Sequence, residues 1–258
     1  MPGHHTYVNH IEEAHALLDA ARSGLELAHA PKDAPIGFAG YSQGGGASLS
    51  AAEYAERYAP DLNVAGTYAG APPTDLPETM RSIDGSAIAH VLGYAINGFS
   101  ERSPEFRDAV LAELNPRGID FLRSAATSCT GDSVLMWGFT NTRMLTRTGE
   151  SLSEIVERKP VVKETLERQN LGKAVPNAPV MMASSPSDDL ISHDQVRRTA
   201  GAYCSMGGTI DFVAAPGTAT IPRTGIDHAV PLYLEMPVGL QYLFDRFEGK
   251  PAPTNCTA

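Results

Sequence analysis

The sequence has no apolar run near the roughly 20 residues that are needed to span a bilayer. It is also short of positive charge, with 20 Lys and Arg against 30 Asp and Glu and a formal net charge of -10. Nucleic acids and anionic membranes repel an acidic chain at long range. We therefore expect no nucleic-acid partner and no stable membrane anchoring, and the charge favours an uncharged small molecule as the ligand.

Cysteine is scarce as well: Cys129, Cys204 and Cys256 are the three in the chain, and no two have C-x-x-C spacing. Because such spacing is typical of structural zinc sites, we expect no metal, and nothing in the sequence requires another cofactor. The composition, with 42% hydrophobic and 19% charged residues, is that of a globular protein. A chain of 258 residues can bury a full core as one domain, which we expect to span residues 1–258.

Apolar periodicity indicates strands and helices that alternate along the chain. Short apolar runs bounded by Pro, Gly or Asp predict buried strands, and Ala- and Leu-rich stretches with helical spacing predict helices. Strands that alternate with helices form a parallel sheet through right-handed crossovers, so we expect an α/β fold. The predicted strands are 36–40, 64–70, 178–183 and 209–213, and the predicted helices around them are 12–27, 47–58, 194–203 and 237–247.

The segment 72–175 has helix-like stretches at 104–114 and 152–168 and no clear strand pattern. It predicts a helical insertion between the second and third strands. Apolar residues at helical spacing are more often core than ligand-binding wall, so we assign none of them to a substrate. Those that we considered are Leu92, Phe99, Leu135, Trp137 and Phe139.

The segment Gly40-Tyr41-Ser42-Gln43-Gly44 carries the strongest sign of chemistry. It matches the G-x-S-x-G pattern of serine hydrolases, in which the serine stands on a sharp turn between a strand and a helix. The predicted strand 36–40 and helix 47–58 supply this setting. A glycine-rich turn that binds phosphate or has no chemistry is the alternative, but neither a Walker lysine nor G-x-G-x-x-G spacing is present. We predict that Ser42 is the nucleophile and that the backbone N–H of Gln43 helps to hold the oxyanion.

A serine nucleophile needs a histidine base, and the histidine needs a carboxylate; in this fold the chain order is serine, acid, histidine. His228 follows the last predicted strand and precedes the final helix, where the base belongs. Asp188 and Asp189 follow the strand 178–183, at a carboxyl end where active sites of parallel sheets form. We predict Asp188 as the acid and His228 as the base, with Asp189 as the second choice for the acid. His193 is too close to Asp188 along the chain to return to the serine. A loop histidine and an Asp pair that only precedes a helix remain the alternatives.

On these residues the chain resembles the secretory lipase family, the lipase A type known from fungi and actinobacteria. Only the nucleophile motif is specific by itself, but the resemblance spans nearly the whole chain. It rests on Gly40-Tyr41-Ser42-Gln43-Gly44-Gly45, Ala69-Gly70-Ala71-Pro72-Pro73-Thr74-Asp75-Leu76, Pro179-Val180, Asp188-Asp189, Asp227-His228 and Phe247-Glu248-Gly249-Lys250-Pro251.

The resemblance implies an α/β-hydrolase with a helical cap at 72–175 that hydrolyses triacylglycerols and simpler esters by a triad of Ser42, Asp188 and His228. It also implies a disulfide between Cys204 and Cys256. Secretion and a role in lipid degradation follow from the family, although the first residues do not have the pattern of a signal peptide. Contact with a lipid interface and the oligomeric state are left open.

The position of Ser42 departs from the family, whose members carry a long segment ahead of the nucleophile. That segment would hold the first strands and the loop with the second oxyanion N–H, so we expect both to be lacking here, together with the partner of Cys129. The strand 36–40 would then have an open edge. A second departure is Ser184-Ser185-Pro186-Ser187 before Asp188, where such hydrolases more usually have a His-Gly pair.

Two other functions remain compatible with these residues. One is a catalytically impaired hydrolase fragment that self-associates or binds a partner through the open sheet edge. The other is an acyltransferase or a peptidase on the same fold, because one triad serves several acyl acceptors and leaving groups.

Overall fold

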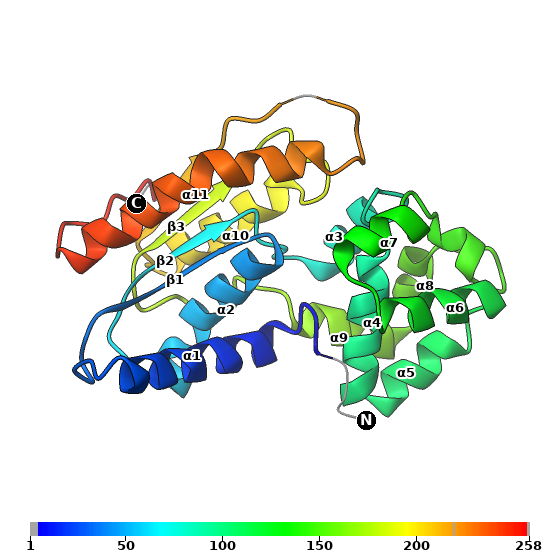
Figure 1. Ribbon diagram of the computed structural model, residues 1–258, viewed down its shortest axis with the longest axis horizontal. Coiled ribbons are helices and arrows are strands. Elements are labelled where there is room, and N and C mark those ends of the chain that lie inside the picture. Colours follow the sequence, from blue (N-terminus) through cyan, green and yellow to red (C-terminus); the bar gives the residue numbers. More distant parts are fainter. Residues whose placement is uncertain (1–4, 219, 257–258) are drawn as a thin grey trace.

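The computed structural model describes residues 5–218 and 220–256, and its centre is a parallel sheet of four strands in the order β1-β2-β3-β4 (Figure 1). β3 is buried along its whole length, which explains its continuous apolar sequence. The predicted α/β fold with a parallel sheet is confirmed. The strands are β1 (Ile36–Tyr41), β2 (Val64–Gly70), β3 (Val180–Ser184) and β4 (Ile210–Ala214).

Helices cover both faces of this sheet (Figure 1). Along β3, Met182 packs with Leu49 and Val196 on one face, and its neighbour Met181 packs with Leu243 on the other. This alternation follows from the two-residue period of a strand. The helices concerned are α1 (His10–Leu27), α2 (Gln43–Tyr58) and α10 (His193–Ser205) on the first face, and α11 (Ile226–Phe247) on the second.

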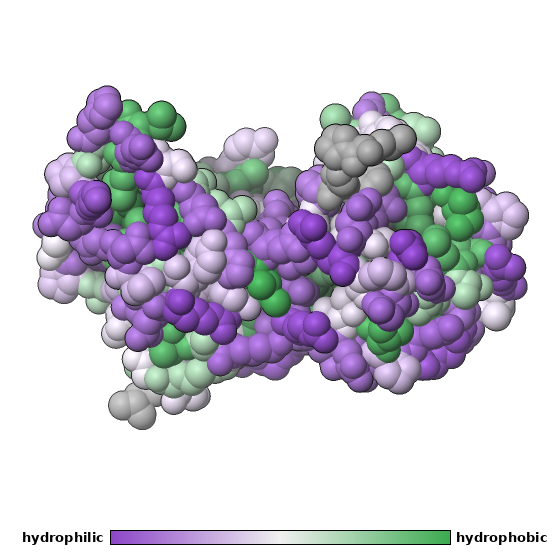
Figure 2. Space-filling view, turned by 90° about the horizontal axis from the view of Figure 1, so that it is seen from below, coloured by the Kyte–Doolittle hydropathy of each residue, from purple (hydrophilic) through white to green (hydrophobic). Residues whose placement is uncertain are grey.

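The segment between β2 and β3 is helical, as its sequence predicts, and it lies beyond the carboxyl ends of the strands (Figure 1). Its helices share an apolar core of their own, which includes Phe106, Phe121 and Ile155. Seen from the α1 side, the sheet and this helical group form two lobes with a mostly hydrophilic surface (Figure 2). The elements are α3 (Leu76–Ile83), α4 (Val91–Arg102), α5 (Pro104–Leu111), α6 (Pro116–Ala125), α7 (Thr130–Trp137), the 3-10 helix η1 (Thr142–Leu145), α8 (Leu152–Arg158) and α9 (Pro160–Arg168).

The helix boundaries differ from the predicted ones most of all in three places. α2 starts at Gln43 rather than at residue 47, so it includes the three glycines that follow Gln43. α11 starts at Ile226 rather than at residue 237, and it contains Pro231 and Pro237, because its buried face packs on the sheet along most of its length. The stretch 152–168 is two helices, since the residue before Pro160 is held in an extended conformation.

The two outer edges of the sheet differ. The C-terminal tail covers β4, where Asn255 exchanges hydrogen bonds with Phe212, and a Cys204–Cys256 disulfide fixes this tail to α10. Cys129 is exposed and unpaired among the described residues. Within the same residues β1 pairs with β2 alone, so its outer edge is open. None of the described helices combines the length and apolarity needed to cross a membrane.

Candidate active site

Ser42 stands on a strained turn between β1 and α2. Its φ of 55° and ψ of -123° lie outside the regions that residues with a side chain favour. The turn is held from both sides: the Ser42 N–H donates to the Gly70 carbonyl at 2.8 Å, and the Gly46 N–H donates to the Ser42 carbonyl at 2.9 Å. At Gly40 and Gly45 a Cβ would overlap backbone of Gly44 and Gly70 respectively, so these positions require glycine. This conformation exposes the serine side chain at the start of a helix, as the sequence motif predicts.

His228 and Asp188 come together although they are far apart in sequence. His228 lies in the first turn of α11, and its Nδ1 donates to Asp188 Oδ2 at 2.8 Å. The other carboxylate oxygen of Asp188 accepts the N–H groups of Leu190 at 2.9 Å and Ile191 at 2.8 Å. The side chain of Asp188 is fully buried and that of His228 is 10% exposed. Because Nδ1 carries the proton toward the carboxylate, Nε2 is the free acceptor of the ring.

Asp189 and Tyr41 hold the backbone that carries His228. Asp189, our second choice for the acid, accepts the N–H of Gly225 at 2.8 Å and that of His228 at 3.2 Å, and so contacts the histidine only through its main chain. Tyr41 donates from its hydroxyl to the His228 carbonyl at 2.7 Å, and the two rings are 5.3 Å apart. Burial raises the pKa of Tyr41 well above its usual value, so the hydroxyl remains a donor.

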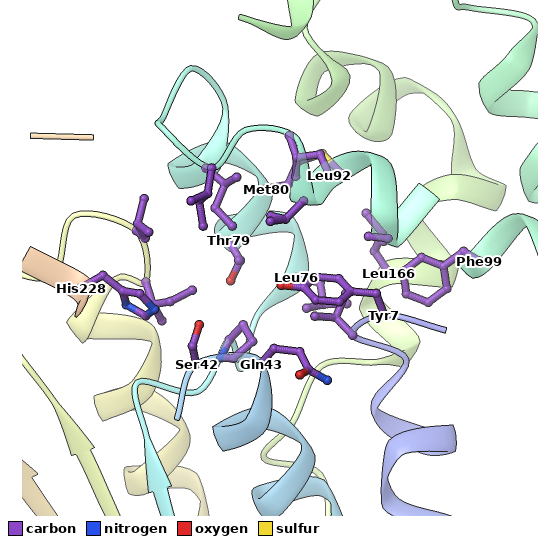
Figure 3. A pocket seen from close by; sticks show the side chains of 18 residues that line it. Tyr7, Ser42, Gln43, Leu76, Thr79, Met80, Leu92, Phe99, Leu166 and His228 are labelled. Atoms are coloured by element: carbon purple, nitrogen blue, oxygen red, sulfur yellow. The ribbon is translucent and has the colours of Figure 1, made fainter. Parts of the chain in front are cut away.

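Ser42, Gln43 and His228 line one cavity, and Figure 3 places Ser42 between the histidine ring and Gln43. The rest of the wall is mostly apolar and comes mainly from the helical group. It includes Leu76, Met80, Leu92, Phe99 and Leu166.

Two of the apolar residues to which we gave no substrate role, Leu92 and Phe99, are therefore part of the cavity wall. By contrast, Leu135 is 88% and Phe139 59% exposed, and Trp137 packs against the core of the helical group. His193 donates to the Ser184 carbonyl at 3.0 Å and is not part of this wall.

Two buried carboxyl groups near the site were not predicted. Glu13 on α1 accepts hydrogen bonds from the Gln43 side chain at 2.5 Å and from the Val8 N–H at 2.9 Å, and burial raises its pKa to about 7 despite them. Glu235 lies on α11 two turns after His228. Burial, with the Asp188 carboxylate adding to it, raises the pKa of Glu235 to about 7. Single acidic residues in helices carry no sequence signal that marks them as buried.

This arrangement suits acyl transfer. Ser42 and His228 face the same cavity, but no hydrogen bond joins their side chains among the described residues; His228 is hydrogen-bonded to the buried Asp188, which is placed to stabilise an imidazolium. The N–H of Gln43, the first residue of α2, has no carbonyl partner within its own helix and can therefore donate to an oxyanion. No cluster of potential metal ligands occurs among residues 5–218 and 220–256.

Comparison with known proteins gives one family. The profile described as Secretory lipase matches residues 2–255. A probable inactive lipase of Mycobacterium tuberculosis is 32% identical over 241 residues, which are 92% of this chain and 49% of that protein. A secreted triacylglycerol lipase of Malassezia globosa is 29% identical over 250 residues, which are 94% of this chain and 50% of that protein.

Among solved structures, lipase A of Candida antarctica in its closed state superimposes with a TM-score of 0.83 at 20% identity. The match covers 97% of this chain and 57% of that one. At this level of identity the likeness concerns the fold, and it agrees with the predicted α/β-hydrolase class. The chain spans about half the length of the relatives that it matches.

Proposed function

The chain belongs to the secretory lipase family, and on that premise we propose that it is a serine hydrolase that cleaves carboxylic esters through an acyl-enzyme on Ser42. The observation that carries the proposal is the strained turn at Ser42, which shares an apolar cavity with a histidine that is hydrogen-bonded to a buried aspartate. Strain of this kind persists only where the surrounding structure holds it, and it clusters at active sites.

In the proposed reaction Ser42 attacks the ester carbonyl and His228 Nε2 accepts its proton. The tetrahedral intermediate, with its oxyanion on the Gln43 N–H, collapses as His228 returns the proton to the leaving alcohol. A water molecule then attacks the acyl-enzyme by the same two steps, with His228 again accepting and returning a proton, and the carboxylic acid is released. Asp188 holds His228 in the required tautomer through its hydrogen bond to Nδ1.

We assign the acyl group of the substrate to the cavity formed with the helical segment 72–175, which acts as a cap over Ser42. The wall supports this assignment because Leu76, Leu92 and Phe99 offer apolar surface and no charge. Triacylglycerols or simpler esters fit such a wall, in line with the names of the secreted fungal relatives. Secretion of this chain is part of the same proposal.

The test is the hydrolysis of p-nitrophenyl butyrate and p-nitrophenyl octanoate by the native chain and by Ser42→Ala. We expect the native chain to release p-nitrophenol and Ser42→Ala to lose activity by at least about 10⁴-fold, because no other group takes over the acyl intermediate. Far-ultraviolet circular dichroism should be the same for both. Equal rates would contradict the proposal.

Two further assays test the alternative functions. Adding an alcohol or amine acceptor separates hydrolysis from acyl transfer, and a peptide substrate tests the peptidase alternative.

A second candidate function, self-association through the sheet edge, is favoured by the open β1 edge among the described residues. Exposed apolar side chains on α11 lie on the same side of the molecule: Phe244 is 57% exposed, and Phe247 packs against Gly37 of β1 while remaining 40% exposed. Open edges of this kind pair with other chains. Sedimentation velocity would detect an oligomer that Phe244→Lys returns to monomer; a monomeric native chain would exclude this candidate.

A further inference from the structure

Tyr7 extends into the cavity from the side of Ser42 that faces away from His228 (Figure 3). The side chain of Gln43 lies on this same side of Ser42, so Tyr7 and Gln43 line the same part of the cavity (Figure 3). None of the hydrogen bonds among the described residues uses the Tyr7 hydroxyl. Its ring neighbour Tyr94, at 5.7 Å, instead donates its hydroxyl to the Ser128 carbonyl at 3.1 Å.

The turn that carries Tyr7 is strained and is tied to the nucleophile turn. Val8 has a φ of 54°, which a β-branched residue adopts only where its surroundings impose it. The Val8 N–H donates to Glu13 Oε1, the same oxygen that accepts the side chain of Gln43. One carboxyl group therefore fixes both Tyr7 and Gln43 on the same side of Ser42.

The chemistry of this hydroxyl suits a hydrogen-bond donor. Burial, with Glu13 and Tyr94 adding to it, raises the pKa of Tyr7 well above its usual value, so the proton stays on the oxygen. Thr79, the other hydroxyl on this part of the wall, already donates to Gln195 Oε1 at 3.1 Å. Several donors together hold an oxyanion, and tyrosine hydroxyls are among the groups that serve beside a backbone N–H.

We propose that the Tyr7 hydroxyl donates a hydrogen bond to the substrate carbonyl oxygen as it becomes the oxyanion, beside the N–H of Gln43. This inference rests on the proposed function of Ser42. It gives the strained turn at Val8 a role, because this turn adjoins Tyr7 and would hold the tyrosine on the cavity wall.

The experiment compares the native chain with Tyr7→Phe, which keeps the ring and removes the hydroxyl. We expect kcat for p-nitrophenyl butyrate, per serine titrated with a fluorophosphonate, to fall roughly 100-fold with little change in KM. Binding of butylboronic acid, which forms a tetrahedral adduct on the serine, should weaken by a similar factor. Tyr94→Phe is the matched control and should keep the native kcat and boronate affinity.

Titrating the active serine makes kcat independent of any fraction of the variant that fails to fold, and the boronate affinity gives a second reading. Unchanged kcat and boronate affinity in Tyr7→Phe would overturn the role of Tyr7 while leaving the role of Ser42 intact. A native chain that neither hydrolyses the ester nor binds the boronate would overturn both. Loss of activity in Ser42→Ala, together with the loss in Tyr7→Phe, would support both.

Discussion

At the scale of single residues, the candidate site depends on two neighbouring aspartates with different partners. Asp188 contacts the imidazole of His228, whereas Asp189 contacts the backbone N–H groups that place it. The sequence predicted Asp188 as the acid and kept Asp189 as the second choice, because it gives only their position after a strand. The choice between them depends on which carboxylate faces the ring, and chain order carries no information on that.

This difference predicts unequal effects of two conservative substitutions. Asp188→Asn should lower kcat for a p-nitrophenyl ester by roughly 10³- to 10⁴-fold, because an amide no longer stabilises the required tautomer and charge of His228. Asp189→Asn retains one oxygen acceptor and should cost much less. Steady-state kinetics at equal protein concentration measure both. The reverse order of effects would transfer the acid role to Asp189.

The raised pKa of Glu235 makes the free energy of unfolding depend on pH. Burial raises the pKa of this side chain, which is 4% exposed, from 4.5 to about 7, so the folded chain binds more protons than the unfolded chain between these values. The free energy of unfolding therefore decreases as the pH rises through this window. Glu235→Gln cannot ionise and should remove that decrease, which amounts to as much as about 3 kcal/mol.

Urea unfolding of the native chain and of Glu235→Gln at about pH 4.5 and about pH 8 measures this effect. The variant should gain stability relative to the native chain at the higher pH only. Glu56→Gln, at an exposed position of α2, is the control and should leave the pH dependence unchanged. A gain that is equal at both pH values would show that ionisation of Glu235 is not the cause.

At the scale of elements, the strands were easier to predict than the helix boundaries. Val180–Ser184 is a short apolar run in a position buried on both faces, and few other structures suit such a run. α11 is different, because Pro231 and Pro237 argue locally against a helix that starts at Ile226. Packing of Leu243 and Tyr242 on the sheet outweighs that preference, and packing of this kind is not visible in local sequence.

The C-terminal tail is an element whose stability we can test. Asn255 covers the edge of β4 at Phe212, and the Cys204–Cys256 disulfide closes a loop with a sequence separation of 52 residues around it. Cys256→Ser should lower the free energy of unfolding by about 2 to 4 kcal/mol because the unfolded chain gains freedom. Amide exchange at Phe212 should accelerate as the tail leaves the edge.

Calorimetry and hydrogen exchange followed by mass spectrometry measure these two changes. Cys129→Ser is the matched control, since this exposed cysteine has no disulfide partner among the described residues and its loss should be nearly neutral. Unchanged exchange at Phe212 in Cys256→Ser would mean that the hydrogen bonds of Asn255 hold the tail without the disulfide.

At the scale of the whole molecule, the cavity is assembled from segments that are distant in the chain. Ser42 follows β1, His228 lies in the first turn of α11, and the apolar wall comes mainly from the helical group between β2 and β3. The motif and the order of its partners sufficed to predict Ser42, Asp188 and His228 as candidates. Sequence reasoning missed Tyr7, because no motif marks a single tyrosine ahead of the first helix. Only the folded chain brings Tyr7 into the cavity that Ser42 lines.

The central claim, that Ser42 is the nucleophile, is tested most directly by covalent labelling. The native chain would be treated with a fluorophosphonate and digested, and the modified residue would be located by tandem mass spectrometry. We expect one adduct, on the peptide that contains Ser42, which is absent from Ser42→Ala and much slower to form in Asp188→Asn. An unlabelled native chain, or an adduct on another serine, would contradict it.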